Sequence, residues 1–177
     1  MYLMKRGFTL VELLVVISII SILAVIALGG FQSTQRKARD GQRKSDLKQI
    51  TNALEVIYYD HGRYPDSDGG EIRACDYDPG APSTSSGPCI WGTDEVKDVD
   101  GAIYIRRLQE DPSSGNYYYR SADNGQRYQL YARLENDNDP DFQTFDFSLF
   151  TSLVPDCGIG DPCNFAITST NTIPTED

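Results

Sequence analysis

The clearest grouping of side chains that could do chemistry is the acidic stretch ENDNDPD at residues 135–141. It places Asp137, Asp139 and Asp141 at alternate positions, with asparagines between them as neutral oxygen donors. Carboxylate and amide oxygens clustered in this way suit a calcium ion. The stretch lacks the glycine and the glutamate that an EF-hand loop needs at its sixth and twelfth positions. Two interpretations remain, a calcium site of another kind and a solvated acidic loop.

The sequence offers little for catalysis. Its one histidine, His61, leaves most Ser/His/Asp and Cys/His arrangements without a base. Carboxylate pairs fall in polar loops where burial would not raise their pKa, and no glycine-rich phosphate loop is present. The net charge of −10 argues against nucleic acid as a partner, because phosphate binding needs a basic surface. We therefore expect a protein that is not an enzyme and has no essential cofactor, with Ca²⁺ as the candidate ion.

The four cysteines are Cys75, Cys89, Cys157 and Cys163. None belongs to a C-x-x-C pair, which argues against a structural zinc site. Because they follow an export-like amino terminus, two disulfides formed in an oxidising compartment are favoured over free thiols in a reducing cytosol. The sequence allows three connectivities. We favour Cys75–Cys89 and Cys157–Cys163, since each closes a short local loop.

The amino terminus combines a basic pair and Gly7 with an apolar run at residues 8–31. A helix of that length can cross a bilayer at a rise of about 1.5 Å per residue. Glu12 lies inside the run, where a carboxylate costs about 2.5–3.5 kcal/mol on insertion scales. An ordinary signal peptide is the alternative, because residues 27–29 could form its cleavage site. Such a peptide would gain nothing from Glu12.

The segment KRGFTLVELLVV resembles the signature of type IV prepilins, which is similar in pilins and in type II secretion pseudopilins. The resemblance implies that a membrane prepilin peptidase cuts between Gly7 and Phe8 on the cytoplasmic side and methylates the new Phe8 amine. Residues 1–7 would be the leader peptide. Residues 8–31 would anchor the precursor in the inner membrane and later form the filament core.

The same resemblance offers a role for Glu12. The positive amine of Phe8 in one subunit would pair with the Glu12 carboxylate of a neighbour, which neutralises two costly buried charges. Such a pair adds little net stability but can fix the register between identical helices. The alternative is a protonated Glu12, or one that reaches toward the cytoplasmic interface.

The elements that position these groups begin with one long helix. Residues 32–60 should continue it as an amphipathic segment, because apolar side chains recur at helical spacing, namely Leu47, Ile50, Leu54, Ile57 and Tyr58. No proline interrupts the chain before Pro65, and Gly62 is the expected stop. We expect a single helix from about residue 8 to residue 59.

A globular head is expected at residues 61–165. Residues 66–100 predict an irregular loop stapled by a disulfide, with Trp91 packed against the head. Strand patterns follow at 102–108, 116–121 and 127–134, and ADNG at 122–125 supplies turn chemistry. In the last strand apolar and polar residues alternate, which predicts a sheet with one buried face.

Two further segments complete the expected head. Residues 145–150, FDFSLF, could add an edge strand. Residues 166–177 have the composition of a disordered tail. The fold class is therefore α+β, a long helix with a small antiparallel sheet head, like the ladle shape of pilins.

The head also resembles the DP…G…Y.Y…Y.LY pattern of major pseudopilins and related pilins, through LQEDPSSGNYYYRS and RYQLYARLEND. The main interpretation is a structural subunit of a type IV pilus-like filament. The alternative is the major pseudopilin of a type II secretion system with a calcium-stabilised head. An alternative of a different class is a secreted calcium-dependent binding protein with an ordinary signal peptide.

The resemblance further implies the partners and the location. The partners would be other copies of the chain, the prepilin peptidase and methyltransferase, an inner-membrane assembly platform and, before assembly, the lipid bilayer. The head would lie outside the cytoplasm, in a filament that spans the periplasm or reaches the cell surface.

Overall fold

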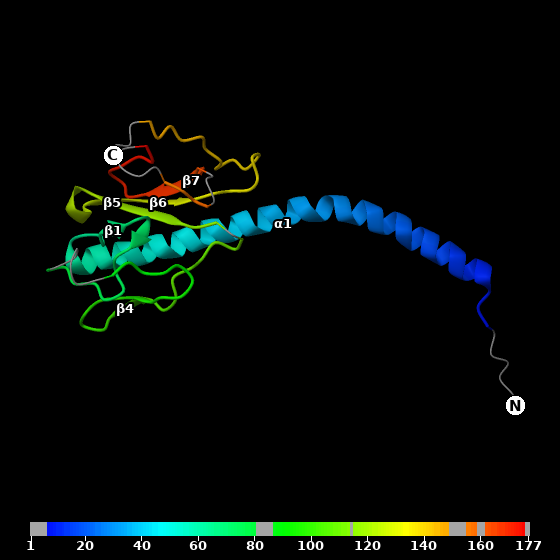
Figure 1. Ribbon diagram of the computed structural model, residues 1–177, viewed down its shortest axis with the longest axis horizontal. Helices are drawn as coiled ribbons and strands as arrows, with labels where there is room; N and C mark the ends of the chain where they lie inside the picture. The colour runs from blue at the N-terminus through cyan, green and yellow to red at the C-terminus, as the bar shows by residue number, and fades with distance from the viewer. Residues whose placement is uncertain (1–6, 81–86, 114, 149–154, 159–161, 176–177) are drawn as a thin grey trace, which may run out of the picture. The chain divides into compact units, whose positions relative to one another are not determined.

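The computed structural model describes residues 7–80, 87–113, 115–148, 155–158 and 162–175, with backbone alone at 26–30 (Figure 1). It divides into two compact units, Met1–Ala38 and Arg39–Asp177, which are described separately. The elements in chain order are helix α1 (Leu10–His61), strands β1 (Ser67–Asp68), β2 (Glu71–Ile72), β3 (Val96–Lys97), β4 (Ile103–Ile105) and β5 (Tyr118–Ala122), the turn η1 (Asp123–Gly125), and strands β6 (Arg127–Ala132) and β7 (Phe165–Thr168). A long helix with small antiparallel sheets confirms the predicted α+β class.

The first unit contains the amino-terminal part of α1. Its large apolar side chains are exposed, from 87% at Phe8 to 47% at Val16. Apolar surface of this extent indicates an interaction surface rather than a free one. Within the residues that the structure describes, no helix is long and apolar enough to count as a span across a membrane.

In the second unit α1 buries the apolar face that its sequence predicts. Leu47, Ile50, Leu54 and Ile57 are each at most 1% exposed. Their spacing of three or four residues places them on one side of the helix, against the head. The helix ends at His61, where Gly62 adopts a φ of +74° and its N–H donates to the Tyr58 carbonyl at 2.7 Å. A glycine in this left-handed conformation is the usual helix stop.

The main sheet has the order β5-β6-β7, and all its pairs are antiparallel. Leu130, in the central strand β6, pairs with Tyr119 on one side and Ile167 on the other. The predicted ADNG turn joins β5 to β6, and its residues Asp123–Gly125 all have positive φ. Figure 1 shows this sheet on one side of α1 and β4 on the other.

Both faces of the central strand β6 are buried, so the prediction of a single buried face is wrong for this strand. Tyr128 and Leu130 pack toward the helix, with the core formed by α1. Tyr131, on the opposite face, is fully buried in a second cluster with the Cys157–Cys163 disulfide, and Phe145 and Phe147 pack against it. The second layer consists of chain segments that lie far away in sequence.

The carboxy-terminal segment supplies part of that second layer. Residues 165–168 form β7, so the prediction of disorder from residue 166 is wrong. Beyond the strand, Gln129 donates to the Ile173 carbonyl at 2.7 Å and the Tyr131 hydroxyl to that of Pro174 at 2.6 Å. The expected edge strand at 145–150 has no described strand residue; 145–148 are irregular and 149–150 lie outside the described residues.

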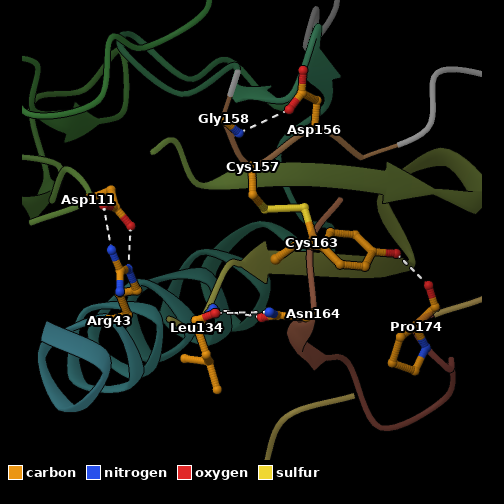
Figure 2. Close-up of a disulfide and its surroundings, with 10 residues drawn as sticks. Arg43, Asp111, Leu134, Asp156, Cys157, Gly158, Cys163, Asn164 and Pro174 are labelled. Atoms are coloured by element: carbon orange, nitrogen blue, oxygen red, sulfur yellow. Dashed lines mark hydrogen bonds and ion pairs between the residues drawn. A yellow bond between two sulfur atoms is a disulfide. The ribbon is translucent and has the colours of Figure 1, made fainter. Parts of the chain in front are cut away.

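The disulfides join the pairs expected from loop length, Cys75–Cys89 and Cys157–Cys163. Figure 2 shows the second of these, whose loop is tied to the start of the β5 segment because the Asn116 N–H donates to the Cys157 carbonyl at 2.9 Å. Residues 66–100, expected to be irregular, contain the short strands β1, β2 and β3.

Candidate functional site

The first candidate site is the segment before α1. Gly7, Phe8 and Thr9 are exposed and precede the helix, so the Gly7–Phe8 peptide bond is open to a protease. A Cβ at Gly7 would meet nothing within 4 Å. Nothing in the described chain therefore requires glycine at this position.

Glu12 forms a capping box with Thr9. The Thr9 backbone N–H and hydroxyl both donate to Glu12 Oε2 at 2.8 Å, and the Glu12 N–H donates back to the Thr9 hydroxyl at 3.2 Å. This reciprocal arrangement satisfies backbone donors that a helix start leaves without partners. The T-x-x-E spacing is its sequence signal, and our sequence analysis did not use it. Glu12 therefore has a local partner in the isolated chain.

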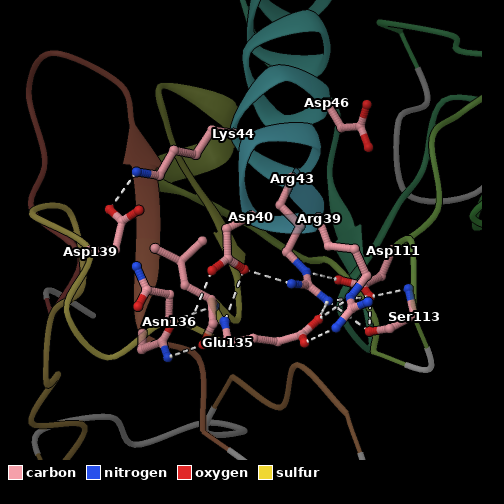
Figure 3. Close-up of polar contacts among 12 residues, drawn as sticks. Arg39, Asp40, Arg43, Lys44, Asp46, Asp111, Ser113, Glu135, Asn136 and Asp139 are labelled. Atoms are coloured by element: carbon pink, nitrogen blue, oxygen red, sulfur yellow. Dashed lines mark hydrogen bonds and ion pairs between the residues drawn. The ribbon is translucent and has the colours of Figure 1, made fainter. Parts of the chain in front are cut away.

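The second candidate site is a buried ionic cluster centred on Arg43 (Figure 3). The guanidinium donates to both oxygens of Asp111, at 2.5 and 3.0 Å. It also donates to Asp40 at 2.7 Å, to Ser113 at 2.7 Å and to Glu135 at 2.9 Å. The side chains of Arg43, Asp40 and Asp111 are at most 2% exposed. Charge-assisted bonds thus replace water around each of these three groups.

The cluster joins α1 to two distant segments. Asp40 accepts the backbone N–H groups of Glu135 and Asn136, both at 2.9 Å. Arg39 donates from Nε to Glu135 at 2.7 Å and also pairs with it through Nη2. One helical turn therefore fixes both the segment after β4, through Asp111, and the segment after β6. Sequence analysis missed this cluster, because a mixed-charge stretch of helix usually indicates a solvated face.

The charges in the cluster shift one another's pKa values. Arg39, and then Arg43, lower the pKa of Glu135 to about 2. Burial raises the pKa of Asp111, but bonds from Arg43 and Ser113 outweigh it and hold that pKa below its ordinary value. Burial alone would lower the pKa of Arg43, but its carboxylate partners raise it by more, so the pKa of Arg43 lies above its ordinary value. All three groups are therefore charged at neutral pH.

The acidic loop is arranged around a lysine of α1. Lys44 Nζ lies 2.5 Å from Asp139 Oδ1 and 2.6 Å from Asp141 Oδ2. Asp137, the third residue expected to bind calcium, is exposed. Among the described residues no three histidine, cysteine or carboxylate side chains converge as a metal site would require. As arranged, the loop does not fit a calcium ion, because an ammonium group already contacts two of its expected ligands.

An open pocket of about 330 Å³ lies beside the cluster, between α1 and the segment after β4, and its lining residues are Gln42, Asp46, Arg107, Leu108, Gln109 and Glu110. Asp46 is 6% exposed, and its carboxylate accepts the Tyr117 hydroxyl at 2.9 Å. Burial raises the pKa of Asp46. The lining contains no histidine, cysteine or serine, so it offers no pair of nucleophile and base.

Known proteins resemble this chain both in the amino-terminal segment and in the unit that contains the ionic cluster. The family described as "Prokaryotic N-terminal methylation motif" matches residues 3–28. The type II secretion system core protein G of Klebsiella michiganensis is 34% identical over 113 residues, which are 64% of this chain and 71% of that protein. The chain belongs to the type IV pilin and pseudopilin superfamily. Since the first unit ends at Ala38, most of the 113 matched residues lie in the second unit.

Other relatives in the superfamily match different shares of the chain. The core protein G of Pseudomonas aeruginosa is 28% identical over 148 residues, 80% of this chain and 96% of that protein. The type IV major pilin protein PilA of Myxococcus xanthus is 39% identical over 62 residues, 35% of this chain and 28% of that pilin. No solved structure matches the chain significantly.

Proposed function

We propose that this chain is the major pseudopilin of a type II secretion system, the repeating subunit of its filament. The observation that carries the proposal is the extent of the match to core protein G relatives, which reaches 96% of the Pseudomonas aeruginosa protein. Because that match covers 80% of this chain, the likeness includes the head. The two disulfides support a head outside the cytoplasm, since such bonds persist in oxidising compartments.

The proposed path of assembly begins with the exposed amino-terminal segment. A prepilin peptidase cuts between Gly7 and Phe8 on the cytoplasmic face of the inner membrane and methylates the Phe8 amine. The match to the methylation motif at residues 3–28 supports this step. The assembly platform then draws the processed subunit from the bilayer into a polymer of identical chains, with residues 8–31 at its centre. The exposed apolar side chains of this segment support that placement.

Glu12 would gain a second partner during this assembly. In the single chain its carboxylate accepts two bonds from Thr9. In the filament it would also meet the Phe8 amine of a neighbouring subunit, which is a charge-assisted contact in an apolar surrounding. The local cap lowers the cost of keeping a carboxylate there before a partner arrives.

A type IV pilus subunit is the second candidate. The 39% identity with PilA of Myxococcus xanthus favours it, although the match covers 62 residues. In that case the same processing would apply, but the filament would extend from the cell surface.

Deletion of the gene in the source bacterium separates the two candidates. If the chain is a pseudopilin, the deletion should make exoproteins accumulate in the periplasm, while surface pili and the behaviours that need them stay normal. Complementation with the intact gene should restore secretion, and complementation with Gly7→Leu should not. Normal secretion together with lost pili would refute the proposal and establish the pilus subunit instead.

A further inference from the structure

The acidic loop at residues 135–141 is attached to α1 at both of its ends. Its first residues are held by Asp40, which accepts the N–H groups of Glu135 and Asn136. Its last residues are held by Lys44, one helical turn further along the same face. Two α1 side chains of opposite charge thus fix the two ends of the loop.

Lys44 contacts the loop with the geometry of a bridging cation. Its Nζ lies 2.5 Å from Asp139 and 2.6 Å from Asp141, and 5.8 Å from the centroid of the Phe165 ring in β7. Asp139 also shapes the loop, since its Oδ1 accepts the Asp141 N–H at 2.9 Å and its carbonyl accepts the Phe142 N–H at 3.1 Å. The ammonium therefore joins two carboxylates that the loop's own backbone already holds close together.

A calcium ion would have to displace this ammonium. Calcium needs six to eight oxygen ligands at about 2.3–2.6 Å. One carboxylate oxygen of Asp139 and one of Asp141 contact Lys44 instead, and Figure 3 shows Lys44 pointing at Asp139. A divalent ion on the same oxygens would lie next to a lysine whose side chain is only 26% exposed, and like charges at that separation repel.

We propose that Lys44 is the built-in cation of the acidic loop, in the place where a calcium ion would otherwise bind, so that the head folds without calcium. The positive charge of a lysine is present whatever the concentration of free calcium, because the lysine is part of the helix against which the loop packs. The proposal does not depend on which filament the chain builds.

The test is thermal unfolding of the full chain in detergent micelles, in the presence of EDTA or of millimolar CaCl₂. The wild-type melting temperature should be the same in both, within about 1 °C. Lys44→Met keeps the length of the side chain but removes its charge, and should lower the melting temperature by about 2–6 °C. CaCl₂ should then recover part of that loss, because the two carboxylates have become free to bind it.

The matched control is Lys48→Met, an exposed lysine on the same helix, which should change neither the melting temperature nor its response to calcium. The double variant Lys44→Met/Asp139→Asn should lose less than the sum of the single variants, since the two groups act together.

Three results would overturn the proposal. The first is a wild-type protein that EDTA destabilises or CaCl₂ stabilises, and this arm decides the matter even if Lys44→Met fails to fold. The second is Lys44→Met melting at the same temperature as Lys48→Met. The third is a destabilised Lys44→Met that does not respond to calcium.

Discussion

Replacing Arg43 by methionine should destabilise the head more than any other single change in the ionic cluster. The variant keeps the aliphatic stem but removes the cation, and leaves Asp40 and Asp111 buried at no more than 2% exposure. Asp40 retains its two backbone N–H donors, and Asp111 retains Ser113. Glu135 is 26% exposed and can recover water. Two buried carboxylates therefore lose their counter-ion, and breaking such a pair costs about 3–5 kcal/mol.

For a chain of this length that loss corresponds to a drop in melting temperature of about 6–20 °C. Circular dichroism melting of the full chain in detergent micelles at neutral pH measures it. Arg36→Met is the matched control, because Arg36 is an exposed arginine of the same helix. The double variant Arg43→Met/Asp111→Leu should recover part of the loss, since it removes one of the two buried carboxylates that have lost their cation and leaves only Asp40. If Arg43→Met melts within 2 °C of Arg36→Met, the reasoning about buried charge is refuted.

Three further changes test the other parts of the structure. Gly7→Leu should leave the fold intact, since a Cβ at this position would meet nothing within 4 Å. Mass spectrometry should nevertheless show an unprocessed precursor, and normal cleavage would contradict the proposed processing. Glu12→Gln can keep the cap with Thr9, whereas Glu12→Val cannot. Both variants should nevertheless yield processed, unassembled subunit. Sheared filaments at normal yield from Glu12→Gln would show that the charge is dispensable. Glu135, whose pKa is lowered from 4.5 to about 2, contributes stability that is complete above pH 4.5 and is lost as the pH falls toward 2; the difference in melting temperature between wild type and Glu135→Gln should shrink over that range, and a constant difference would argue against it.

Local patterns in the sequence predicted the helix well. The apolar side chains from Leu47 to Ile57 repeat at helical spacing, and Gly62 marks the end of the helix. The course and the end of the helix therefore depend on residues within one or two turns of each other. The hairpin between β5 and β6 was similarly local, because ADNG fixes its turn. The Thr9–Glu12 cap had an equally local signal and could have been found.

The remaining features depend on residues far apart in the chain. Nothing near Tyr131 indicates that residues 145–147 and 174 will cover it, so the second buried face of the sheet could not be read from alternation alone. The strand at 165–168 lies in a stretch rich in threonine and serine, and only its pairing with β6 makes it a strand. Arg43 finds its partners 68 and 92 positions away. Sequence periodicity contains no information about such pairings.

The sharing of one guanidinium among three carboxylates restricts how this sequence can change in evolution. A substitution at Arg43 leaves Asp40 and Asp111, which come from two separate segments of the chain, without their cation at the same time, and leaves Glu135 with Arg39 alone. An evolutionary replacement of Arg43 must therefore change several positions together, or pass through an intermediate sequence whose head is unstable. Homologous sequences that lack an arginine at this position should also lack the acidic residues at positions 40 and 111. Loops elsewhere in the head are free of that linkage and can drift, lengthen or acquire new disulfides while the attachment to the helix stays fixed.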